Sequence, residues 1–338
     1  MSHQVQIDYQ GVAIQCQSVC EVAEKRLQEL DEMLEKARES STSLMNIQAS
    51  EAYQAIQKAR EDLSNQIQDV RAEAQSKAAH RDASVTGSLT KAQRLQQTVN
   101  TLSSQKIIEF NSLLQMLLSD SIQSNYQKLL NQGNGVVMDD DALKQFLDGI
   151  EDETLRQFTY IAYLQNTSLR GEALLEAGRA LVGKTYEARL EEERSRIREE
   201  LKAARVEAST IEEVTKASGG TAKEQIAAMQ EAATTEIVGE KVRQKSLKII
   251  MQAIKARGFV VDKTNIKIKR DTNEVIMVAQ KASGEKAEFR VFLDGKFIYD
   301  FRGYEGQACQ KDIGPFMKDL EEVYGVHVTK QTEIWSNP

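Results

Sequence analysis

The chain contains no proline before Pro315, and its only other proline is Pro338, the last residue. An average globular sequence carries about 5% proline, so roughly sixteen would be expected over a stretch of that length. Because proline lacks an N–H and its ring clashes with the preceding turn, it interrupts helices. A long proline-free stretch rich in Ala, Glu, Gln, Leu and Lys therefore predicts a protein made mostly of long helices.

Aromatic residues make up only 6% of the chain and charged residues 28%. With few large side chains to anchor a thick core, burial must come from aliphatic seams between helices. No stretch approaches the roughly 18 apolar residues of a membrane helix. The N-terminal MSHQVQIDYQ lacks the segments of a signal peptide, and three cysteines do not form a disulfide framework. We expect a soluble, cytoplasmic protein with no membrane partner, no cofactor and no metal.

Apolar residues recur at alternating spacings of four and three from Cys16 to Ala37, and at spacings of three and four from Ala49 to Ala74. This is the a/d spacing of a coiled-coil seam. The second helix is expected over 43–82, a rod of about 60 Å. A third helix is expected after a break at Val85–Ser88, and it leads into the strongly apolar residues 107–118.

Further along the chain, a helix is predicted over 153–166 and a long charged rod over 168–217. The sequence SGGT at 218–221 is the clearest hinge signal. Two helical stretches follow, at 222–232 and 242–256. The strand-like segments after them alternate in polarity, with two-residue hairpin turns at Ser283-Gly284 and Asp294-Gly295.

Charge divides the chain near residue 235, because residues 1–239 carry −11 and residues 240–338 carry +4. The predicted fold is mainly α: a long antiparallel coiled coil or helical bundle, followed by a small C-terminal α+β domain with an antiparallel sheet. The expected divisions are a helical hairpin or coiled coil (1–134), a helical region with a charged rod (135–217), a hinge or linker helix (218–234) and the α+β domain (235–338).

Residues 178–185, GRALVGKT, match the phosphate-binding loop pattern G-x-x-x-x-G-K-[ST]. In such a loop Gly178 and Gly183 would let backbone amides surround phosphates, Lys184 would reach the β/γ oxygens, and Thr185 would bind Mg²⁺. The pattern needs a buried strand before it, whereas the preceding LRGEALLEA is typical of a helix. We therefore favour two glycines tolerated within or between helices over a nucleotide-binding site.

Residues 240–302 carry a net charge of +7. A basic face of this kind can contact phosphates, but no platform of aromatic residues for stacking bases is evident. We favour a solvated or protein-facing surface over a nucleic-acid interface. The candidate residues, six on one predicted helix and three on the outward side of a predicted strand, are Lys241, Arg243, Lys245, Lys248, Lys255, Arg257, Lys267, Lys269 and Arg270.

Cysteines and acidic clusters offer the remaining candidate chemistry. Cys16 and Cys20 could bind metal or sense redox state, but both lie on the predicted seam and are interpreted as buried packing residues. Cys309 lies near the start of the closing helix, where the helix dipole could lower the pKa of its thiol, and packing is again favoured. The clusters Asp139–Asp141 and Glu151–Glu153 are interpreted as helix caps and solvated faces rather than cation sites.

Two C-terminal segments resemble known families. The sequence KARGFVV at 255–261, followed by strands, resembles the end of a small uncharacterised family found in bacteria and plastid genomes. The segment FLDGKFIYDFRGYEGQACQKDIGPFMKDLEEVYGVHV resembles a second such family, with a DG hairpin, G-x-x-G-x-x-C and a helix ending in Tyr-Gly. The matching residues, which we interpret as structural, are Asp294, Gly295, Gly303, Gly306, Cys309 and Gly325.

The resemblance covers under a quarter of the chain and implies an accessory domain of the kind that accompanies AAA+ ATPases, some in predicted bacterial conflict systems. It supplies no catalytic residue. We expect a non-catalytic coiled-coil scaffold or adaptor of a bacterial multiprotein assembly, with a protein partner such as an AAA+ ATPase and with self-association into a homo-oligomer. The alternatives are a nucleic-acid-binding protein that uses the basic C-terminal domain and an NTPase that uses residues 178–185.

Overall fold

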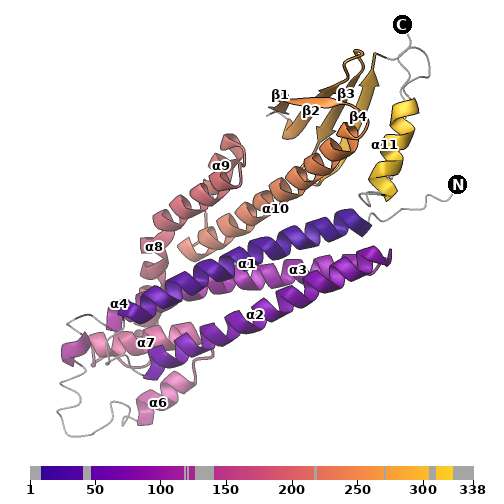
Figure 1. Cartoon of the computed structure of the whole chain (residues 1–338). Helices are drawn as coiled ribbons and strands as arrows, with labels where there is room; N and C mark the ends of the chain where they lie inside the picture. Colours follow the sequence, from indigo (N-terminus) through magenta and orange to yellow (C-terminus); the bar gives the residue numbers. More distant parts are fainter. Residues whose placement is uncertain are drawn as a thin grey trace, which may run out of the picture.

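A computed structural model describes residues 9–40, 47–117, 119, 122–125, 141–216, 219–269, 272–303 and 310–322. Several residues discussed above lie outside these ranges, namely Asp139, Asp140, Arg270, Gly306, Cys309 and Gly325. The described part is mainly α-helical and carries a small C-terminal α+β unit, which confirms the predicted fold class (Figure 1).

Three long segments form the first layer of the helical body. They are α1 (Tyr9–Ser40), α2 (Ile47–Ala79) and α3 (Val85–Asn100), and α3 continues through a π-helical turn, η1 (Thr101–Lys106), into α4 (Ile107–Leu117). At about 1.5 Å per residue, α1 and α2 are rods of about 50 Å. They lie side by side (Figure 1), and the predicted seam residues are buried between them, including Cys16, Leu30 and Ile67.

The break before α3 lies at residues 80–84, one turn earlier than the sequence pattern indicates. Arg81 has a positive φ of 54° there, and the Ser84 amide donates to the Asp82 carboxylate at 2.8 Å. An aspartate that satisfies a nearby backbone amide ends one helix and begins the next without glycine or proline.

The second layer contains α6 (Asp141–Asp148), α7 (Glu153–Gln165), α8 (Gly171–Ala203) and α9 (Ala208–Thr215). The predicted rod over 168–217 is therefore interrupted. Arg205 adopts a positive φ of 67°, and the Val206 amide bonds back to the Leu201 carbonyl at 3.0 Å, which closes the end of α8. Glu207 then caps α9 by accepting from the Ser209 amide at 2.9 Å.

Helix α10 (Ala222–Lys255) is a single element of 34 residues, where the sequence pattern indicates two. It begins after Gly219 and Gly220, whose φ values of 98° and 73° favour glycine, and its first turn is closed by a capping box between Thr221 and Glu224. The helix passes without interruption through residue 235. It runs alongside α1 towards the sheet (Figure 1), so the body and the C-terminal unit share one helix.

The sheet is antiparallel, in the order β1 (Val260–Lys269), β2 (Glu274–Gln280), β3 (Lys286–Val291) and β4 (Phe297–Arg302). The end of α10 and helix α11 (Gln310–Glu322) pack on one face, where Ile254, Phe289 and Phe316 are buried together. We call the sheet, α11 and the C-terminal part of α10 the head. None of the described helices has the length and apolar character needed to cross a membrane.

The hairpin turns differ in one detail from those predicted. In each hairpin the glycine amide donates to the carbonyl three residues before it and closes a β-turn. The next residue pairs with the opposite strand again, so the loop has three residues, of which glycine is the last. Gly284 and Gly295 hold that position with φ of 106° and 80°. A turn followed by a left-handed glycine is a common alternative to the two-residue loop.

Candidate functional site between the body and the head

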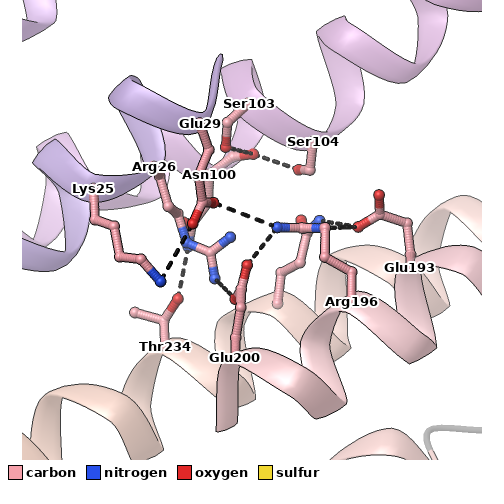
Figure 2. A network of polar contacts seen from close by, with 11 residues as sticks. Lys25, Arg26, Glu29, Asn100, Ser103, Ser104, Glu193, Arg196, Glu200 and Thr234 are labelled. Carbon is pink, nitrogen blue, oxygen red and sulfur yellow. Dashed lines mark hydrogen bonds and ion pairs between the residues drawn. The ribbon is translucent and has the colours of Figure 1, made fainter. Parts of the chain in front are cut away.

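A buried ion-pair network joins α1 to α8 (Figure 2). Arg26 of α1 is only 3% exposed and donates to Glu200 of α8 at 3.0 Å. Arg196 donates to Glu193 at 2.7 Å and to the other oxygen of Glu200 at 2.5 Å, and lies 3.8 Å from Glu29. Together with Lys25, which pairs with Glu29, the network contains three cations and three carboxylates. It is therefore electrically balanced and carries no surplus charge with which to hold an ion.

Burial affects the two arginines of this network differently. Burial lowers the pKa of Arg26, and within the described part of the chain its Nε and Nη1 have no hydrogen-bond partner. Burial alone would also lower the pKa of Arg196, but Glu193 and Glu200 raise it overall. Both side chains retain their charge at neutral pH, since an arginine is protonated far above that range.

The π-helical turn η1 lies against this network. Ser103 and Ser104 both donate to the Asn100 carbonyl, and the Asn100 side chain donates to Thr234 of α10 at 3.2 Å (Figure 2). A π-helical turn leaves the regular bonding pattern locally incomplete, and such turns are frequent at functional sites. Here two hydroxyls of the turn donate to the Asn100 carbonyl, and the Asn100 side chain brings the end of α3 into contact with α10.

A buried carboxylate joins four helices at a second position. Glu109 of α4 is 5% exposed and accepts from Thr154 of α7 and from Tyr186 of α8, each at 2.6 Å. The ammonium groups of Lys106, at the end of η1, and Lys223, in α10, lie 3.3 and 3.4 Å from its carboxylate oxygens. Burial first, and then the bond to Glu109, raise the pKa of Tyr186, so its phenol stays protonated and donates.

The segment that matches the phosphate-binding loop lies inside α8. A Cβ on Gly178 would lie 2.3 Å from Oγ1 of Thr159, so this glycine permits close approach of α7 and α8. The Thr185 hydroxyl donates to the Leu181 carbonyl of its own helix at 3.0 Å. A phosphate-binding loop turns its amides towards the anion, whereas α8 uses them in helical bonds. The segment does not have the conformation that the nucleotide-binding interpretation requires.

Two of the predicted basic residues hold α10 against α1. Lys241 and Lys245 lie 3.3 and 3.1 Å from the two oxygens of Glu21, and Lys245 also donates to Ser18 at 3.2 Å. Burial alone would raise the pKa of Glu21, but the two lysines lower it overall. Their positive charge therefore serves a contact within the fold.

Other predicted basic residues hold the head together. Arg243, 1% exposed, pairs with Glu240 and donates to the carbonyl of Asn273, in the turn between β1 and β2, at 2.9 Å. Arg257 pairs with Asp319 of α11, and Lys269 lies 3.4 Å from Glu274. Lys248, Lys255 and Lys267 are exposed. Among the candidate cations that the structure describes, those engaged in these pairs are therefore not available to a common basic face.

The β3–β4 turn also contacts this junction. Gln15 of α1 donates to the Asp294 carbonyl at 3.4 Å. A Cβ on Gly295 would lie 2.9 Å from a methyl carbon of Val242, and one on Gly239 would lie 3.3 Å from Leu293. Gly295, with a φ of 80°, therefore permits close approach of the β3–β4 turn to α10, and Gly303 has a positive φ of 81°. Sequence reasoning missed Gly239, because it lies between the two expected helices, at 222–232 and 242–256, and no pattern marked it as a contact.

Cys16 and Cys20 are both buried in the seam of α1. A hydrogen bond to Cys20, together with burial, raises the pKa of the Cys16 thiol, and the same bond lowers that of Cys20. In the ranges that the structure describes, no group of three or more His, Cys, Asp and Glu side chains is placed to hold a metal ion. Asp152 caps α7 by accepting from the Leu155 amide at 3.0 Å, as its cluster predicts.

No protein-family model, curated protein sequence or solved structure matches the chain.

Proposed function

We propose that the chain is a non-catalytic scaffold or adaptor in which the helical body is a rigid spacer and the head contacts a protein partner. The observation that carries this proposal is the continuity of α10. Its first half is buried in the body beside Tyr186 and Ile197, and its second half in the head beside Phe259 and Phe289. Because α10 contributes to both hydrophobic cores, it fixes the position of the head relative to the body.

The contacts beside α10 support a fixed orientation of the head. Lys241 and Lys245 hold α10 against Glu21 of α1, and rotation of the sheet about α10 would separate Gln15 of α1 from the β3–β4 turn. It would also expose Gly295 and Val242, which approach too closely to admit another side chain. Each contact is modest alone, but together they oppose any swivel of the head.

For the partner, we propose a protein of a bacterial multiprotein assembly. The resemblance of the last part of the chain to accessory domains makes an AAA+ ATPase the first candidate. Nucleic acid is a weaker candidate, since five of the nine basic residues are engaged in ion pairs or buried contacts within the fold.

Distance measurements between two spin labels test the rigid-spacer role. Suitable positions are Gln75 on α2 and Ala282 in the turn between β2 and β3, both exposed, each replaced by cysteine in a C309S background. We expect one narrow distance distribution, and dilution with unlabelled protein separates distances within a chain from those between chains. A broad or multimodal distribution within the chain would contradict a rigid spacer.

A matched variant shows whether the junction contacts are responsible. E21Q in the same labelled background should broaden the distribution, whereas E172Q, at an exposed ion pair on α8, should leave it unchanged. Equal widths in all three proteins would show that α10 alone fixes the head and that the contact with α1 is dispensable.

A further inference from the structure

The exposed apolar side chains of the described chain gather on the sheet. Among large hydrophobic residues, those that are exposed are Val260 (68%), Ile268 (50%) and Ile298 (58%), all in β1 or β4. We call the face turned away from α10 and α11 the outer face (Figure 1). The strand alternation places Val260 and Ile298 on it, because their neighbours Val261 and Phe297 pack on the helices.

The register arranges the outer face in rows, and the row nearest the β2–β3 turn places Lys286 opposite Arg302, which pairs with Asp300 at 2.6 Å. Lys267, Ile276, Arg290 and Ile298 lie directly opposite one another across the four strands, and we call them the basic row. A second row lies two residues away from the basic row along each strand. It consists of Val278, Glu288 and Asp300, and we call it the acidic row. Each of these two rows contains apolar side chains from the central or edge strands and charges of a single sign.

These rows complement each other under two-fold symmetry. Consider a two-fold axis that runs parallel to the basic and acidic rows, midway between them. Rotation about this axis places the acidic row of one molecule over the basic row of the second molecule. Glu288 of each copy then faces Arg290 of the other, and Val278 of each faces Ile276 of the other. A two-fold interface must be complementary to itself in this way, and sheets commonly pack face to face in near alignment.

We propose that the outer face binds a second copy of this chain through its acidic and basic rows. This inference rests on the proposed function, since it supplies the homo-oligomer in which such a spacer would act. Four strands at about 4.8 Å and six residues at about 3.3 Å give a face of roughly 20 by 20 Å. Two such faces cover less than the roughly 1,200 Å² of a standard stable interface. The dimer is therefore weak and concentration-dependent, and the charges set its orientation more than its strength.

Charge reversal tests the pairing. Within one chain Glu288 and Arg290 lie 3.1 Å apart and are partly exposed, so reversal of either leaves the fold intact. Sedimentation velocity from low to high micromolar concentration should show a monomer–dimer equilibrium for the wild type. E288R and R290E should each weaken dimerisation by roughly tenfold or more, because the mismatch occurs twice in a symmetric dimer.

Mixing the two variants gives the decisive result. The E288R copy presents two cations where the R290E copy presents two anions, so the mixture should form a heterodimer that neither variant forms alone. The control E199R makes the same charge change at an exposed pair on α8 and should dimerise like the wild type. A monomeric wild type, unchanged variants, or no rescue on mixing would each overturn the proposal.

Two further readouts separate this proposal from others. A duplex DNA probe bound more tightly by E288R and more weakly by R290E, without dimerisation, would overturn the dimer and assign the outer face to nucleic acid. The spin-label distance within the chain should stay narrow in E288R. A narrow distance with no dimer in the wild type would leave the rigid spacer standing and reject only the self-association.

Discussion

Lys245 of α10 lies 3.1 Å from the carboxylate of Glu21 on α1, although 224 positions separate them in the sequence. Lys241, one helical turn earlier, lies 3.3 Å from the other oxygen of the same carboxylate. One acidic side chain therefore attaches the last long helix to the first, at the level where the head begins.

The substitution E21Q should lower the free energy of unfolding at neutral pH by about 0.5–1 kcal/mol, since partly exposed ion pairs contribute little each. The pKa of Glu21 lies below its usual 4.5 in the folded protein. Its stabilisation is therefore present above 4.5 and is lost as pH falls through the folded value. Urea unfolding at neutral and strongly acidic pH measures this. A difference from wild type that persists in acid would contradict the ion-pair explanation, and E172Q is the exposed control.

The two glycines of the GRALVGKT segment should respond to alanine in opposite directions. G178A should destabilise by about 1–3 kcal/mol because the new Cβ would meet Thr159 at 2.3 Å. G183A should stabilise by up to about 1 kcal/mol, because nothing lies within 4 Å of its Cβ and alanine favours the helix. Thermal unfolding of both measures this. The phosphate-binding interpretation would be restored if G178A and G183A destabilised the protein equally and if nucleotide raised the unfolding temperature of the wild type but of neither variant.

The seams and the strand alternation could be predicted because each depends on local periodicity. Leu27, Leu30 and Ile67 are buried where the three-four spacing places them. The interruption at 204–207 could not be predicted, because apolar spacing continues across it from Leu201 to Ile211 and a non-glycine residue, Arg205, takes the left-handed conformation. The continuity of α10 was hidden for the opposite reason, since charge and composition change within one helix.

The candidate site could not be predicted, because it consists of ion pairs and hydrogen bonds between residues that are far apart in the sequence. A run of lysines indicates positive charge but not its partner, and Glu21 lies in a different helix from Lys241 and Lys245. Glu109 stands out only as a single carboxylate in an apolar stretch. Its donors Thr154 and Tyr186 lie 45 and 77 positions away.

Removal of the Glu109 carboxylate should be among the more damaging changes in the body. E109A leaves the hydroxyls of Thr154 and Tyr186 buried without an acceptor, at a cost of about 2–4 kcal/mol. Y186F removes one bond and should cost about 1 kcal/mol, and the two changes together should cost less than their sum, because they share one interaction. Denaturant unfolding of the single and double variants measures the coupling. Strict additivity would show that the Tyr186–Glu109 bond contributes nothing, and K184M, at an exposed neighbour, is the control.

Glu236 of α10 should oppose folding at neutral pH. Burial, and the nearby carboxylates Glu213 and Glu240, raise its pKa in the folded protein, against an opposing effect of Arg243. A carboxyl with a raised folded pKa favours its protonated form, so stability falls as pH rises from 4.5 through the folded value. E236Q removes the charge and should stabilise the protein at neutral pH by less than about 1 kcal/mol after screening by solvent. The gain should vanish in acid, where Glu236 is protonated in both states. Unfolding midpoints across this pH range measure the effect of E236Q on stability. E231Q, at an exposed position of the same helix, is the control. A stabilisation by E236Q that is the same at every pH would show that packing rather than charge is responsible.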